Sequence, residues 1–131
     1  MRTKSIILSA SILGAIAVIM GAMGAHALKA LLSENALESY LTGARYNMFH
    51  AIVILAVAGN KKYIQKKWQS LAVKFILIGT ALFSGSIYLL STKEITGLDQ
   101  LSFLGPITPI GGVLLILGWA FLGIGAVRNS K

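Results

Sequence analysis

The sequence predicts an all-α membrane protein, a single domain over residues 1–131 built as a bundle of four transmembrane helices. Apolar residues make up 56% of the chain and charged residues 12%, about half the share usual in a soluble domain. The apolar residues gather into four long stretches separated by short polar segments. A soluble chain of this length needs a large polar exterior, so part of the surroundings here is expected to be lipid.

The first stretch, residues 5–25, contains 21 uncharged residues. As a helix it would be about 30 Å long, the thickness of the hydrocarbon core of a bilayer. Its basic start and its Ala25-His26-Ala27 ending resemble a cleavable signal peptide. The apolar run is longer than the usual signal-peptide core of roughly 7–15 residues. We therefore interpret it as a retained span.

The second span is predicted over residues 41–59, with a polar outer end and a densely apolar part at 48–59. In the preceding segment, residues 27–41, apolar side chains recur near helical spacing with Lys29, Glu34 and Glu38 between them. This pattern predicts a short amphipathic segment at the interface, or an outward extension of the second span.

The third and fourth spans are predicted over residues 71–90 and 107–127. The third is interrupted only by Lys74, near its start. Pro106 and Pro109 precede or open the fourth, where a missing N–H costs little. No linker divides the chain into two domains.

The net charge of +8 indicates topology rather than a nucleic-acid partner, because the basic residues lie at the edges of apolar runs. Four crossings place both termini and the middle loop on one side. The opposite side has few basic residues and all four carboxylates. By the positive-inside rule the N- and C-termini are expected to be cytoplasmic. The residues assigned to that side are Arg2, Lys4, Lys61, Lys62, Lys66, Lys67, Arg128 and Lys131.

Small residues predict how the helices pack, since close backbone approach drives association in lipid. In the last span three glycines recur every seven residues, which places them on one stripe of a slightly supercoiled helix. The simpler interpretation is that glycine is frequent in membrane helices. The expected packing positions in a compact bundle are Gly14, Gly21, Gly85, Gly111, Gly118 and Gly125.

A candidate polar cluster combines His26, Arg45, Tyr46, Asn47 and His50 on the expected outer side. An ionisable residue at membrane depth costs several kcal/mol unless it is paired, so it indicates a functional site by default. The functional interpretation is an outward-facing pocket for a proton, an anion, a lipid head group or a metal. The structural interpretation is that neutral His50 hydrogen-bonds to a neighbouring helix while Arg45 and Tyr46 anchor at the head groups.

No cofactor or metal site is expected, because cysteine is absent and two histidines without carboxylates are weak evidence for a metal. No catalytic triad, phosphate-binding loop or metalloprotease motif is present, so no catalytic residue is assigned and an enzyme is not expected. Ser84, Ser86 and Tyr88 are expected to form hydrogen bonds between helices.

Four stretches of the chain resemble a family of small membrane proteins. They are residues 21–28 (GAMGAHAL), 46–51 (YNMFHA), 83–88 (FSGSIY) and 109–119, which begins PIGG and ends GW. The chain is similar to the domain-of-unknown-function 423 family, whose eukaryotic relatives are called transmembrane protein 256. It departs from the family pattern at Met23, where an aromatic is more usual, and at Asn47, where glutamine is. The resemblance implies a multi-pass protein of the bacterial inner membrane and suggests that His26 and His50 belong to the family's pattern.

These observations leave three hypotheses about function. The first is a non-enzymatic structural, assembly or lipid-interacting protein. The second is a small oligomeric transporter or channel that uses the polar cluster of the second span. The third is an enzyme or electron carrier with a bound cofactor. The expected partner is the lipid bilayer, with a second membrane protein or further copies of the chain as the protein partners that these hypotheses allow.

Overall fold

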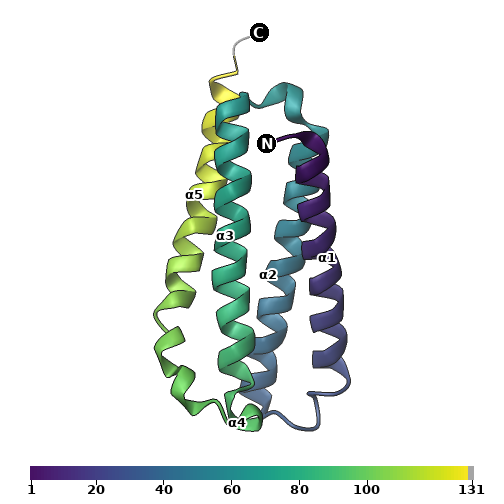
Figure 1. Cartoon of the computed structure of the whole chain (residues 1–131), viewed down its shortest axis with the longest axis vertical. Coiled ribbons are helices and arrows are strands. Elements are labelled where there is room, and N and C mark those ends of the chain that lie inside the picture. The colour runs from purple at the N-terminus through teal and green to yellow at the C-terminus, as the bar shows by residue number, and fades with distance from the viewer. Residues whose placement is uncertain (130–131) are drawn as a thin grey trace.

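The computed structural model, which describes residues 1–129, has four long helices that alternate in direction (Figure 1). All four are long and apolar enough to cross a membrane, and no described residue lies in a strand, which confirms the predicted fold class. The long helices are α1 (Thr3–Ala25), α2 (Glu34–Gly59), α3 (Lys66–Ser91) and α5 (Ile107–Val127). The short ones are η1 (Lys61–Tyr63), α4 (Lys93–Thr96) and η2 (Asp99–Leu104).

Two helices begin earlier than predicted. Helix α2 starts at Glu34 because Ser33 caps it, its Oγ accepting a hydrogen bond of 3.3 Å from the Ala36 N–H. Residues 26–31 form turns, and from Glu34 onward the amphipathic segment is an extension of α2 and not a separate interfacial helix. Helix α3 starts at Lys66 rather than at residue 71, since lysines continue a helix readily outside the apolar region.

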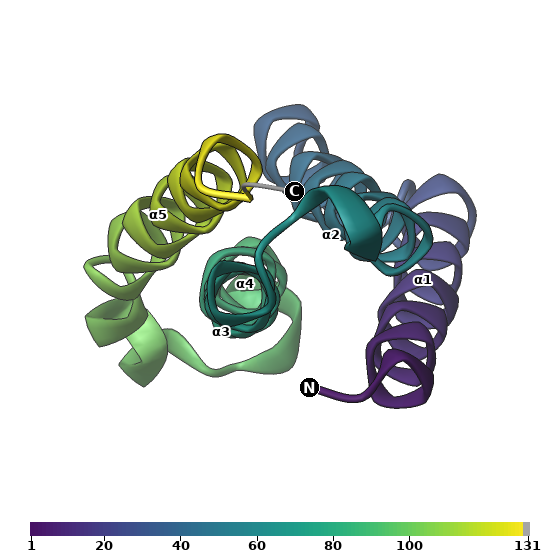
Figure 2. The same cartoon turned by 90° about the horizontal axis from the view of Figure 1, so that it is seen from above.

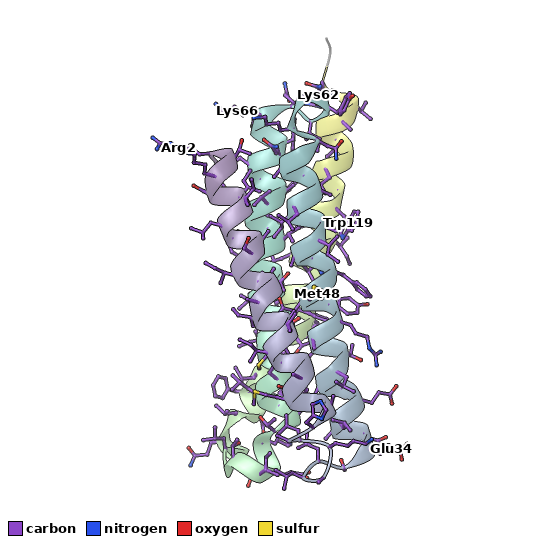
Figure 3. The ribbon with its side chains drawn as sticks, turned by 90° about the vertical axis from the view of Figure 1, so that its right-hand side faces the viewer. Arg2, Glu34, Met48, Lys62, Lys66 and Trp119 are labelled. Atoms are coloured by element: carbon purple, nitrogen blue, oxygen red, sulfur yellow. The ribbon has the colours of Figure 1, made fainter. Side chains whose placement is uncertain are left out.

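Charge separates the two ends of the bundle. We call the end where α1 begins and α5 finishes the basic end, and the opposite end, with the α1–α2 turn, α4 and η2, the acidic end (Figure 1). Figure 3 shows Arg2, Lys62 and Lys66 at the basic end and Glu34 at the acidic end. The carboxylates of the acidic end are Glu34, Glu38, Glu94 and Asp99. Lys131, which the sequence places at the basic end, lies outside the described residues.

The four long helices form an open arc rather than the compact bundle predicted. Extensive contacts join α1 to α2, α2 to α3 and α3 to α5. Viewed from above, α3 lies between α2 and α5 while α1 packs on the far side of α2 (Figure 2). The main apolar core is where α1, α2, α3 and α5 all contribute, and its most buried members are Ile6, Ala10, Ile54, Val73 and Ile76.

Glycines bring α5 against α3. A Cβ atom at Gly111 would collide with the Phe83 backbone nitrogen and lie 2.8 Å from Phe83 Cα. At Gly118 it would lie 2.6 Å from Ile76 Cγ1, and at Gly125 it would lie 2.8 Å from Trp68 Cβ. All three glycines of the seven-residue series therefore make close approaches on the α3 side, and at Gly111 the approach is to backbone atoms.

The other glycines singled out from the sequence do not make close contacts. A Cβ at Gly14 would lie 3.7 Å from Ala51 Cβ, an ordinary contact, and at Gly21 or Gly85 it would meet nothing within 4 Å. Instead α1 buries Ala10, Ala17 and Gly24 against its neighbours, a stripe of seven-residue spacing. Gly14 and Gly21, the packing positions expected in this helix, are not among its buried residues.

Hydroxyl groups join the helices, as the sequence predicts. Ser84 Oγ of α3 donates to the Gly43 carbonyl of α2 at 2.8 Å. Ser86 Oγ lies 2.6 Å from Thr108 Oγ1 of α5. The expected bonds across helices at Ser84 and Ser86 are confirmed, and both are short enough to fix the relative positions of the helices they join.

A candidate functional site between α2 and α5

The structure does not gather the five residues of the predicted polar cluster into one site. His26 is exposed in the turn that follows α1, and Arg45 is exposed on α2. Tyr46 is 41% exposed, whereas Asn47 and His50 are buried. The two buried side chains contact different helices: Asn47 contacts α3 and His50 contacts α5.

His50 lies near the middle of the span rather than toward one end of it. Ala51 packs beside Gly14, which is the central residue of α1, eleven residues from each end of that helix. His26 is therefore about 16 Å away from His50 along the bundle axis. This separation contradicts a metal site shared by the two histidines. No group of three or more metal-ligating side chains occurs among residues 1–129.

Asn47 belongs to the interface between α2 and α3. Its Nδ2 donates to the Tyr88 hydroxyl at 3.3 Å, and the ring of Tyr88 packs on Tyr40 with centroids 5.1 Å apart. Asn47 Oδ1 has no hydrogen-bond partner among the described residues, and neither has the buried Thr80 hydroxyl on the facing helix. Tyr40 is itself buried in this interface, at 1% exposed.

His50 forms a hydrogen bond at each ring nitrogen. Nδ1 lies 2.7 Å from the Tyr46 carbonyl oxygen, and Nε2 lies 3.4 Å from Trp119 Nε1 of α5. A carbonyl oxygen can only accept and an indole N–H can only donate, so Nδ1 carries the proton and Nε2 is the acceptor. The bond accepted from Trp119 requires the neutral imidazole. The contact with Trp119 is the bond to a neighbouring helix that the structural interpretation of His50 predicts.

A groove of about 330 Å³ opens beside this contact. We call it the α2–α5 groove, because it lies where α2 and α5 fail to pack against one another. His50, 6% exposed, is the most buried polar side chain in its wall, while Trp119, 53% exposed, stands at its membrane-facing mouth. Tyr46 packs against Phe83 with ring centroids 4.8 Å apart. The lining residues are Tyr46, His50, Phe83, Gly112, Leu115, Ile116 and Trp119.

Sequence reasoning found the α2 side of this groove and missed the α5 side. Trp119 was not among the candidate site residues; its indole faces outward and only its N–H is directed inward to His50. Phe83 and Leu115 carry no polar group that would have marked them. Residues of α2 and α5 line the same groove because of the order in which the helices are arranged around α3. Hydropathy does not encode that order.

Comparison with known proteins agrees with this architecture. The profile of the family described as "Protein of unknown function (DUF423)" matches residues 20–112. The UPF0382 inner membrane protein YgdD of Escherichia coli (strain K12) is 34% identical over 131 residues, covering 100% of this chain and 95% of the relative. The UPF0382 membrane protein YwdK of Bacillus subtilis (strain 168) is 37% identical over 126 residues, covering 89% and 94%.

A yeast relative shares most of the same length. The UPF0382 membrane protein C1782.12c of Schizosaccharomyces pombe is 36% identical over 112 residues, covering 85% of this chain and 92% of the relative. No solved structure matches the fold. With four apolar helices long enough to cross a bilayer and membrane proteins as relatives, the chain is a multi-pass membrane protein. It belongs to the DUF423 family, as the resemblance of its sequence motifs indicates.

Proposed function

We propose that this protein is a lipid-interacting membrane protein that binds one membrane-soluble molecule in the α2–α5 groove. The observation that carries the proposal is a buried imidazole in the wall of a membrane-facing groove of about 330 Å³. Ligand pockets are typically concave and mostly apolar, with a few placed polar groups, and begin at about 300 Å³. A histidine with a purely structural role would be expected inside a packed interface, not beside a groove.

The depth of His50 restricts the ligand. His50 lies near the centre of a hydrocarbon core about 30 Å thick, so the polar groups of a phospholipid would remain roughly 15 Å away. The Nδ1 proton is donated to the Tyr46 carbonyl. The group that remains for a ligand is Nε2, which can accept a hydrogen bond. The ligand we expect is an apolar molecule that carries a hydroxyl donor to the bilayer centre.

The groove walls favour a ring as the part of the ligand that carries the hydroxyl. Tyr46, Phe83 and Trp119 present aromatic faces or edges, which pack favourably on planar rings. A phenol or ring alcohol satisfies both requirements. An acyl chain would meet the walls equally well but has no donor that could replace the Trp119 N–H at Nε2 of His50.

Trp119 would act as the gate of this site. Its hydrogen bond to His50 is long, at 3.4 Å, and the indole is half exposed. Hydrogen bonds between membrane helices average about 0.6 kcal/mol, so a ligand hydroxyl can replace the indole N–H at small cost. Rotation of the indole away from His50 would enlarge the groove and expose Nε2.

The test is mass spectrometry of the intact protein after purification from membranes in mild detergent. We expect one bound molecule per chain, loss of that molecule in His50→Leu, and retention in His50→Gln, whose amide oxygen can accept the same bond. Ser86→Ala is the matched control, because it removes a buried hydrogen bond to α5 outside the groove. Equal occupancy in wild type and His50→Leu, or an empty groove in both, would contradict the proposal. An empty chain in a stable oligomer would favour the transporter or channel alternative.

We also propose that the basic end faces the cytoplasm and that the protein resides in the inner membrane. The support is the concentration of lysine and arginine at that end, together with the description of the Escherichia coli relative as an inner membrane protein. A single cysteine introduced at Asn60 should be shielded from an impermeant maleimide in intact cells. One introduced at Ser33 should be labelled. The opposite pattern would reverse the orientation.

A further inference from the structure

The basic end contains a second cavity, of about 660 Å³, separate from the α2–α5 groove. It lies where the start of α1, the short helix η1 and the start of α3 come together. Three basic side chains and no acidic one contribute to its wall. The lining residues are Met1, Arg2, Thr3, Lys61, Lys66 and Gln69.

Hydrogen bonds between the elements fix this cavity in shape. Lys61 Nζ donates to Thr3 Oγ1 at 3.4 Å, which ties η1 to the start of α1. The Met1 backbone nitrogen donates to Ser70 Oγ of α3 at 3.2 Å. Gln69 Nε2, buried on α3, donates to the Val57 carbonyl of α2 at 3.2 Å. All three walls are therefore joined without any ligand.

The helix starts at the cavity add to its positive potential. Neither α1 nor α3 has a side-chain cap or an acidic residue in its first turn. The first backbone N–H groups of a helix have no partner within it, and the helix dipole places partial positive charge there. Residues of both helix starts line the same cavity as Arg2, Lys61 and Lys66.

Two other lysines of this end lie over aromatic rings and outside the cavity. Lys62 Nζ lies 4.7 Å from the ring centre of Tyr63, and Lys67 Nζ lies 5.7 Å from that of Trp68. The four carboxylates lie at the acidic end. No described carboxylate therefore lies at this end to neutralise the cavity, and its uncompensated positive charge favours a bound anion.

We propose that this cavity binds the phosphate of an anionic membrane lipid, with the acyl chains lying along α1 and α3. Lysine and arginine donate charge-assisted hydrogen bonds to phosphate oxygens, and basic pockets between membrane helices bind phosphorylated head groups. A lipid places its phosphate at the ends of the spanning helices, which is the depth of this cavity. A soluble phosphate would offer the same chemistry without the chains.

The experiment compares lipid binding in three proteins held in uncharged detergent micelles. The first is the wild type, the second is Lys61→Gln with Lys66→Gln, and the third is Lys62→Gln with Lys67→Gln. The two double variants lose the same charge at the same end, but only the first loses it from the cavity. Short-chain phosphatidylglycerol is titrated, and binding is read from thermal unfolding and from intact-protein mass spectrometry. A control titration uses short-chain phosphatidylcholine.

The cavity variant should bind phosphatidylglycerol roughly 30-fold more weakly than the wild type, at about fivefold per lysine. The Lys62→Gln, Lys67→Gln protein should stay within about threefold of the wild type, because those lysines lie outside the cavity. Equally weakened phosphatidylglycerol binding in both double variants would show that general surface charge attracts the lipid. That result would contradict a binding site in the cavity. Inorganic phosphate at millimolar concentration should not displace the lipid. If it does so and protects the protein equally, soluble phosphate is the ligand and the lipid proposal fails.

Discussion

Replacing Gly111 with alanine tests the contact that holds α5 against α3. The added Cβ would meet the Phe83 backbone nitrogen, with Phe83 Cα at 2.8 Å and the Gly79 carbonyl oxygen at 2.9 Å. These are backbone atoms of a packed helix, so they cannot rotate away as a side chain can. Helix α5 must move outward instead.

The magnitude follows from two opposing terms. Restoring ordinary contact distances of about 3.4 Å or more requires a shift of about 0.5–1 Å, and overpacking of this kind costs about 1–3 kcal/mol. Replacing glycine by alanine inside a helix returns about 0.5–1 kcal/mol. We expect a net loss of about 1–2 kcal/mol in the free energy of unfolding for Gly111→Ala.

The adjacent Gly112→Ala is the matched control. Its Cβ would lie 3.8 Å from Phe83 Cδ2, an ordinary contact, so only the helix-propensity gain remains. The assay is reversible unfolding in mixed micelles, followed by circular dichroism as the denaturing detergent fraction rises. If Gly111→Ala is as stable as Gly112→Ala, the two helices do not approach as closely as described and the account of their packing is wrong.

Three further substitutions test the polar contacts by the same unfolding assay. Thr80→Val should leave stability unchanged or raise it by up to about 1 kcal/mol, because the buried hydroxyl has no described partner; a clear loss would reveal a bond. Ser84→Ala should lower stability by about 0.5–1.5 kcal/mol through loss of the bond to the Gly43 carbonyl, and no change would make that bond energetically neutral. Trp119→Phe should cost about 0.6 kcal/mol in the wild type and nothing further in His50→Leu; additive losses would show that the two side chains are not coupled.

The fold was predictable because the signals for it are local. A membrane helix can be recognised from its length and hydropathy. The bounds of α5 agree with the predicted span. The seven-residue spacing of Gly111, Gly118 and Gly125 likewise marks one helix face whatever lies opposite. The start of α2 was left open between an interfacial segment and an extension of the span, because Glu34 and Glu38 end the apolar run without ending the helix.

The candidate site was only half predictable, since it depends on which helices are neighbours. His50 stands out as an ionisable residue in an apolar span, but its partner Trp119 follows it by 69 residues and reads as an ordinary apolar residue. Gly21 and Gly85 were predicted to be contacts and are not. Each fits a small-residue pattern, yet each has open space where a neighbour was expected.

The occupancy of the α2–α5 groove is the central claim, and photo-crosslinking in native membranes tests it directly. A benzophenone side chain at position 116 would replace Ile116, which lines the groove, and one at 113 would replace Val113, an exposed α5 residue that does not line it. We expect position 116 to yield one discrete hydroxyl-bearing adduct and position 113 to yield the mixture of bulk phospholipids. The same phospholipid mixture at both positions would contradict the account.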